Sequence, residues 1–153
     1  CALRLAEGGH TVMVSDLTQV MVAEAERMAE LLIISVYFRV IDAEEPDFTA
    51  HSFDAIVTRK LTWTLPHLSL AYRRWHALLK PGGRLINFDA DYCREKPPSS
   101  LPEHHAHQDV GEDLMREYDR MKDVLRPTQR PRPELDAAML AMAGFSPTNM
   151  QTG

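Results

Sequence analysis

The sequence predicts an α/β fold, an open parallel sheet with helices on both faces, and two observations carry this prediction. Short apolar runs rich in β-branched residues alternate with longer segments of helical period. The 153-residue chain also has the length and composition of one globular domain, with 44% hydrophobic and 25% charged residues. Strands that alternate with helices are typical of parallel sheets, because parallel neighbours need a crossover connection.

The elements follow in order along the chain. Four runs have the composition of buried strands: residues 11–15, 36–41, 53–57 and 85–88. Apolar residues recur at helical spacing in five segments: residues 1–7, 18–32, 68–79, 111–125 and 133–143. The turn at residues 80–83 contains two glycines and a proline, so we expect it to stop the preceding helix.

Polar side chains follow the predicted strands at their carboxyl ends. Asp16, Asp42 and Asp89 each come directly after a strand, and the third strand leads into Thr58 and Arg59. Right-handed crossovers bring these ends to one edge of the sheet, outside which ligands of open parallel sheets bind. A carboxylate there suits ribose hydroxyls, because it accepts two hydrogen bonds at once. Asp16 equally suits the start of the following helix, where a negative charge is favoured.

Four stretches between residue 1 and about residue 92 carry a resemblance to a known family. They are residues 3–18, 38–44, 52–59 and 63–85, the last including Lys80-Pro81-Gly82-Gly83. In this order and spacing they resemble class I S-adenosylmethionine-dependent methyltransferases of the small-molecule type, which have a Rossmann-like fold. The resemblance implies S-adenosylmethionine as cofactor and methyl transfer to a small-molecule acceptor.

The resemblance also implies a cofactor site, made of Asp16, Leu17, Met21, Asp42, Ala43, Thr58 and Arg59. In it, Asp16 holds the ribose hydroxyls and Met21 packs on the adenine. The Asp42–Ala43 pair meets the adenine edge, where Asp42 accepts a hydrogen bond from the exocyclic amine. Thr58 and Arg59 lie beside the methionine part. From its spacing alone, Met21 equally fits a plain core position.

One feature of that family is missing from the chain. None of the seven glycines forms the G-x-G-x-G loop that follows the family's first strand. The chain opens in helical pattern without Met and stops after the start of a strand, so we expect a piece of a domain. It would comprise a partial methyltransferase domain over residues 1–153, lacking the first strand and the end of the sheet. We therefore expect this chain alone to bind S-adenosylmethionine weakly.

Within residues 1–153 we expect three parts. Residues 1–92 form the cofactor-binding core, residues 93–132 form lid or insert loops with a helix, and residues 133–153 form the last helix and the start of a strand. We assign no catalytic residue, because methyl transfer from a sulfonium chiefly needs alignment and desolvation. Three candidate general bases lie near the expected site, each with an ordinary structural alternative: His67, Asp89 and Asp91.

The histidines at positions 104, 105 and 107 form a conspicuous cluster. Neighbours at i and i+1 do not share a helical face and no cysteine lies with them, so we predict a surface loop or substrate lid and no metal site.

The composition argues against several classes of partner and compartment. The net charge of -5 disfavours nucleic-acid binding, and no apolar run approaches the roughly 18 residues of a membrane span. The two cysteines, Cys1 and Cys93, cannot build a disulfide framework, which favours the cytoplasm. Two alternatives stay open: a nicotinamide-dependent Rossmann oxidoreductase, which also places an acidic residue after its second strand, and a non-catalytic binding domain with a decayed methyltransferase fold. The sequence does not give the oligomeric state.

Overall fold

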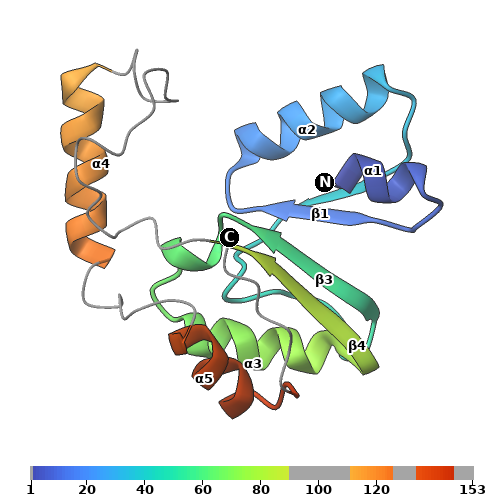
Figure 1. The fold of residues 1–153 in the computed structure, drawn as a ribbon. Coiled ribbons are helices and arrows are strands. Elements are labelled where there is room, and N and C mark those ends of the chain that lie inside the picture. The colour runs from blue at the N-terminus through green and yellow to red at the C-terminus, as the bar shows by residue number, and fades with distance from the viewer. Residues whose placement is uncertain (1, 90–110, 126–133, 147–153) are drawn as a thin grey trace.

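The computed structural model describes residues 2–89, 111–125 and 134–146 (Figure 1). Within these ranges the elements are, in chain order, α1 (Ala2–Glu7), β1 (Met13–Asp16), α2 (Gln19–Leu31), β2 (Tyr37–Val40), β3 (Phe53–Arg59), the 3-10 helix η1 (Thr62–Thr64), α3 (Leu68–Leu78), β4 (Leu79–Phe88), α4 (Glu112–Leu125) and α5 (Glu134–Met142). The helices and strands that the sequence predicts within these ranges are present, with ends that differ by a few residues.

The strands form two parallel pairs. β1 pairs with β2 from Met13 opposite Tyr37 to Asp16 opposite Val40. β3 pairs with β4, and the last matched residues are Arg59 and Phe88. Each pair is a two-stranded sheet, and in the described part of the chain no further strand joins β1 or β3 at its other edge. The predicted α/β fold with parallel strands is confirmed, and Figure 1 shows β1, β3 and β4 pointing in the same general direction.

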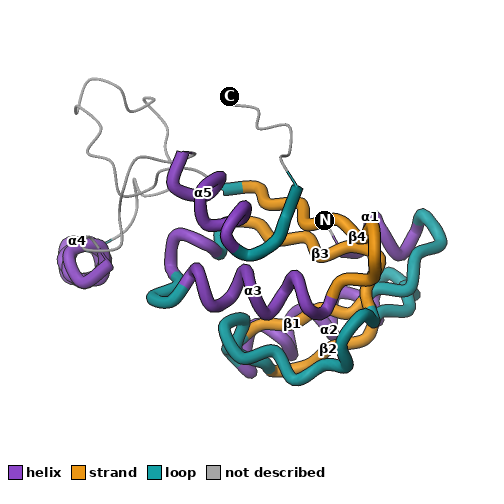
Figure 2. Tube along the Cα trace, turned by 90° about the horizontal axis from the view of Figure 1, so that it is seen from below, coloured by secondary structure: helices purple, strands orange, loops and turns teal. Residues whose placement is uncertain are grey.

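The core lies beneath β3 and β4. Leu68, Ala71, Tyr72 and Trp75, all from α3, form one buried cluster. Their spacing of three, one and three residues places them on one helical face, which is the pattern of an amphipathic helix. α5 packs beside α3, and the buried Tyr72 hydroxyl donates to Asp136 Oδ1 of α5 over 3.2 Å. Figure 2 shows α3 and α5 close together, with α4 standing apart from both sheets, as it also does in Figure 1.

The turn at residues 80–83 differs from the expected loop between a helix and a strand. α3 ends at Leu78, and β4 begins at once with Leu79, which pairs with Phe53. The register then shifts, so that Ala55 pairs with Arg84 and the intervening residues form an irregularity in the strand. A Cβ on Gly83 would lie 2.9 Å from the carbonyl oxygen of Lys80, so this close approach requires glycine.

The strand predicted from residue 145 onward stays a prediction. Residues 145 and 146 are not in a strand, and residues 147–153 lie outside the described residues. Phe145 instead packs against the core cluster, and its ring meets that of His76 edge to face, with centroids 4.9 Å apart.

Candidate functional site

Asp16 and Asp42 lie at the carboxyl ends of the neighbouring strands β1 and β2. Asp16 Oδ1 accepts a hydrogen bond from the Thr18 N–H over 2.8 Å, and Asp42 Oδ1 accepts one from the Glu44 N–H over 2.8 Å. The Ile41 N–H donates to the Asp16 carbonyl over 3.0 Å, which ties the two strand ends together. Both side chains are exposed, and in the described part of the chain their second carboxylate oxygens have no partner. Each aspartate is therefore oriented by one oxygen, and its other oxygen can accept a further hydrogen bond.

Apolar side chains lie beside Asp16 without being buried. Leu17 is 69% exposed and Met21 is 58% exposed, whereas Val22 and Ala29 are the buried residues of α2. The described residues therefore do not place Met21 in a core, which was the structural alternative for this position. An apolar surface next to a hydrogen-bonding carboxylate is the arrangement that a flat, polar-edged ligand such as adenine requires.

The segment after β2 is held against α3. The Ala43 carbonyl accepts a hydrogen bond from the Trp75 indole N–H over 2.8 Å, and Arg74 donates to the Glu44 carbonyl. The buried Glu44 carboxylate accepts the backbone N–H of His67, the N-cap residue of α3. This contact agrees with a structural role for the position of His67 at the helix start. The loop that carries Asp42 is thus fixed by the core helix.

A chain of hydrogen bonds joins the ends of β3 and β4 to η1. The Thr58 hydroxyl donates to Asn87 Oδ1 over 2.9 Å, and Asn87 Nδ2 donates to the Thr62 hydroxyl oxygen over 3.1 Å. The Thr62 hydroxyl donates to Asp89 Oδ2, which also accepts the Trp63 N–H over 3.1 Å. Thr58 and Thr62 are buried. This network orients Thr58 toward β4 and engages Asp89 in holding η1.

Arg59 ends β3 with an exposed side chain that makes no hydrogen bond or ion pair among the described residues. The next residue, Lys60, has a φ of 54°, and its N–H donates to the Phe88 carbonyl over 2.9 Å. This left-handed residue turns the chain from β3 into η1. The Arg59 guanidinium is consequently available to an anionic ligand at this edge.

Sequence reasoning missed Asn87 and Thr62. The signal for Asn87 was a polar amide inside an otherwise apolar strand, since such a group needs partners when it is half-buried. Thr62 carried no comparable signal, because its partners come from β4. Asp91 and the histidines at positions 104, 105 and 107 lie outside the described residues. Within residues 2–89, 111–125 and 134–146, no three His, Cys, Asp or Glu side chains gather to hold a metal.

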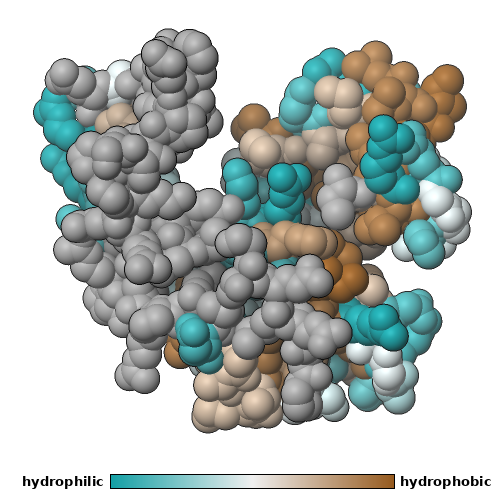
Figure 3. Space-filling model, in the orientation of Figure 1, coloured by the Kyte–Doolittle hydropathy of each residue, from teal (hydrophilic) through white to brown (hydrophobic). Residues whose placement is uncertain are grey.

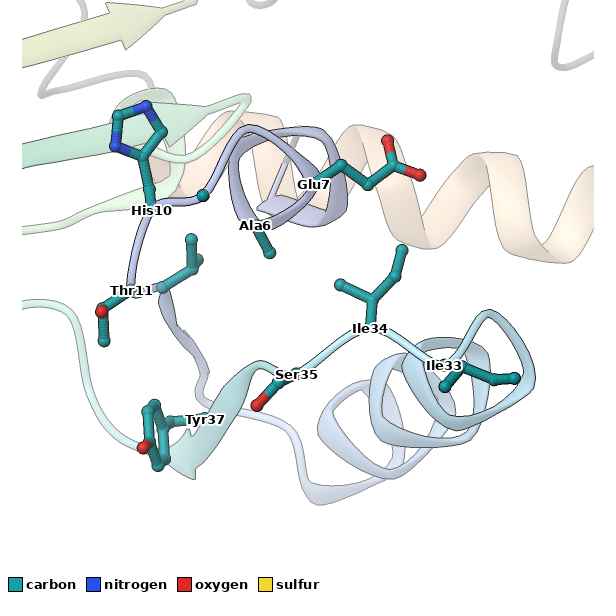
Figure 4. A pocket seen from close by; sticks show the side chains of 10 residues that line it. Ala6, Glu7, His10, Thr11, Ile33, Ile34, Ser35 and Tyr37 are labelled. Atoms are coloured by element: carbon teal, nitrogen blue, oxygen red, sulfur yellow. The ribbon is translucent and has the colours of Figure 1, made fainter.

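An open pocket of about 430 Å³ lies at the opposite edge of the sheet, before β1 and β2 begin (Figure 4). Ala6 and Ile34 point into it, whereas the side chains of Glu7 and His10 point away. Because its polar groups do not converge, this pocket lacks the features of a specific polar site. The strand carboxyl ends remain the candidate site.

A parallel α/β fold with acidic residues after its strands is typical of Rossmann-like domains. A family model described as a methyltransferase domain matches residues 1–87, more than half of the chain. The chain belongs to this methyltransferase-domain family.

Individual relatives match shorter parts. The chain is 34% identical over 85 residues to phosphoethanolamine N-methyltransferase 3 of Arabidopsis thaliana, a match that covers 55% of this chain and 17% of that protein. Among solved structures, the cyclase SpnF is 30% identical with a TM-score of 0.53, over 55% of this chain and 32% of that one. The chain therefore spans about a sixth of the curated relative and about a third of that solved structure.

A broader structural match supports the fold. The structure of a putative methyltransferase from Bacillus halodurans matches 89% of this chain and 53% of the Bacillus chain, with a TM-score of 0.62 and 24% identity. The described helices include none with the length and apolarity needed to cross a bilayer.

Proposed function

We propose that this protein transfers a methyl group from S-adenosylmethionine to a small-molecule acceptor, and that residues 1–89 carry part of the cofactor site. The proposal rests on Asp16 and Asp42, which lie at the carboxyl ends of β1 and β2 in a chain of the methyltransferase-domain family. One carboxylate oxygen of each accepts a backbone hydrogen bond, and the other has no partner among the described residues. We also propose a cytoplasmic protein that binds neither nucleic acid nor membrane.

The residues present suit this cofactor chemically. The free carboxylate oxygen of Asp16 would accept the ribose hydroxyls, and that of Asp42 would accept the adenine amine. The exposed Leu17 and Met21 side chains would cover the adenine face. The Arg59 guanidinium would pair with the methionine carboxylate. Ala43 and Thr58 would contribute the walls between these groups, since the hydrogen bonds above fix both.

When bound, the cofactor would supply an activated methyl group for transfer to a nucleophilic atom of the acceptor, with S-adenosylhomocysteine as the other product. The chain's own contribution is to hold the two reactants in line and exclude water. Asp89 Oδ2 already accepts two hydrogen bonds, so we assign this side chain to positioning η1. The acceptor's proton would pass to solvent once the methylated product leaves the site.

Ultraviolet crosslinking of tritium-labelled S-adenosylmethionine to the chain tests the proposal, because it detects weak binding. Asp16→Asn should lower the labelling by about tenfold, as expected for the loss of a charged hydrogen-bond acceptor. Asp54→Asn is the matched control, since Asp54 lies near the amino end of β3, away from the strand carboxyl ends that form the candidate site.

Unlabelled S-adenosylhomocysteine should compete and NADH should not. Equal labelling of the two variants, or equal competition by NADH, would overturn the proposal and favour another Rossmann-like activity. An intact protein that binds S-adenosylmethionine but methylates nothing in a cell extract would instead favour the non-catalytic binding domain. Calorimetry of the unmodified chain should show no low-micromolar affinity.

A further inference from the structure

Trp63 is held in one orientation at the carboxyl end of β3. Its backbone N–H donates to Asp89 Oδ2 over 3.1 Å, and its indole N–H donates to the Lys60 carbonyl over 3.2 Å. The side chain is nevertheless only half-buried. An indole ring fixed through its polar atom presents the rest of its apolar surface to whatever lies beside it.

The neighbour of Trp63 is Tyr118, from the distant helix α4. The two rings meet edge to face, with centroids 6.3 Å apart and planes at 63°. Tyr118 belongs to an apolar stripe with Leu114 and Met121, which are 65% and 37% exposed. α4 therefore brings apolar and aromatic side chains to η1, although the helix stands apart from both sheets (Figure 1).

Two arginines of α4 form ion pairs within the helix. Arg116 pairs with Asp113 over 2.9 Å, and Arg120 pairs with Glu117 over 3.3 Å. These two arginines are thus partnered within their own helix. The side chain that α4 brings against Trp63 is the aromatic ring of Tyr118.

We propose that Trp63 and Tyr118 form the acceptor-facing wall of the site and select an acceptor with a planar, apolar body. This inference rests on the proposed methyl transfer, which assigns adenine and ribose to the ends of β1 and β2 and the methionine part to Arg59. Trp63 lies four residues after Arg59, at the carboxyl end of β3, and the acceptor would have to bind near the methionine part that Arg59 would hold. A fixed pair of rings favours a planar ligand, because such a ligand stacks without ordering further side chains.

The probe for this wall is p-nitrophenol, a planar hydroxyl compound that absorbs where tryptophan emits. It should quench the tryptophan fluorescence of the chain saturably. Buried Trp75 is present in every variant, so each variant keeps a tryptophan that can transfer its excitation energy to the bound probe. Tyr118→Ala should raise the apparent Kd by about fivefold, the range of an aromatic contact. Val124→Ala, a change at a 78% exposed position of the same helix, should leave it unchanged. Trp63→Ala should raise the Kd and Trp63→Phe should restore it.

Phosphoethanolamine should not compete with p-nitrophenol, and Tyr118→Ala should leave the crosslinking of S-adenosylmethionine unchanged. Equal Kd values for Tyr118→Ala and Val124→Ala would overturn the proposal that Trp63 and Tyr118 form this wall. Competition by phosphoethanolamine, or quenching that never saturates, would overturn it as well. If the quenching behaves as expected while S-adenosylmethionine fails to label the chain, the proposed function fails and the wall stands as a binding site.

Discussion

The segment that comprises β1, α2, β2 and the residue after β2 has fewer buried apolar side chains than the unit made of β3, α3, β4 and α5. In the first, which we call the N-terminal unit, Val22, Ala29 and Ile41 are the buried apolar residues. In the second, the C-terminal unit, α3 alone contributes five buried side chains. Large exposed hydrophobic residues instead gather in and beside the N-terminal unit: Leu17, Val20, Met21, Met28, Leu31, Leu32, Ile33, Tyr37 and Val40. Figure 3 shows this apolar surface over α2.

We infer from this difference that the C-terminal unit provides most of the stability and the N-terminal unit most of the binding surface. Exposed apolar surface costs free energy in water, and a concentration of it is a common mark of a binding surface. Part of it, at Leu17, Val20 and Met21, lies beside Asp16, where the proposed cofactor would cover it. The C-terminal unit supplies the packed support, and it holds the N-terminal unit through the Ala43–Trp75 hydrogen bond. We therefore expect ligand binding to stabilise the N-terminal unit most.

The largest expected effect is a direct test of this division. Leu68→Ala, at a position 7% exposed in the core, should lower the free energy of unfolding by about 2 to 5 kcal/mol. Leu31→Ala removes the same atoms from a side chain that is 65% exposed in α2, and should change it by less than about 0.5 kcal/mol. Urea unfolding followed by circular dichroism measures both. Similar losses in the two variants would mean that the N-terminal unit packs as tightly as the C-terminal one.

A smaller effect separates the polar contacts of the two units. Asn87→Leu leaves the buried Thr58 and Thr62 hydroxyls without their amide partner, and should cost about 1 to 3 kcal/mol. The side chain in Asp16→Asn keeps an oxygen that can accept the exposed hydrogen bond from the Thr18 N–H. The free energy of unfolding of this variant should therefore stay close to that of the unmodified chain. The same urea experiment applies. A stable Asn87→Leu variant would show that the network at the ends of β3 and β4 is replaceable.

Much of the fold followed from local patterns in the sequence. The β-branched runs predicted the strands, and the spacing of Leu68, Ala71, Tyr72 and Trp75 predicted the buried face of α3. The placing of Asp16 and Asp42 at adjacent strand ends followed from strand direction alone, since parallel pairing puts both at one edge. Such features depend on neighbours along the chain, which a single sequence displays.

Features that depend on partners far away in the sequence could not be predicted from local patterns. Thr62 and Asn87 are 25 positions apart, and nothing near either residue announces their hydrogen bond. The exposure of Met21 was undecided because an apolar stripe marks a face without showing whether anything covers it. The strand residues at 80–83 were predicted as a turn, because glycine and proline favour a turn whether or not that turn is part of a strand irregularity.

The smallest expected effect compares one surface ion pair from each unit. Lys80 Nζ lies 2.9 Å and 2.8 Å from the two oxygens of Asp54, and this hydrogen bonding and charge lower the pKa of Asp54 below its ordinary value of 3.8. A lowered pKa in the folded state means a stabilisation that is complete above the ordinary value and disappears as the pH falls through the folded value.

The matching pair in the N-terminal unit is Glu24 with Arg27, whose hydrogen bond lowers the pKa of Glu24. That pair lies within one helix, whereas Asp54 and Lys80 join two strands, so Asp54→Asn should lower the urea midpoint at neutral pH more than Glu24→Gln does. Both differences should vanish in acid, well below pH 3.8, and shrink in about 1 M salt, because both pairs are exposed. A larger loss for Glu24→Gln would place more of the cooperative stability in α2 than its burial indicates.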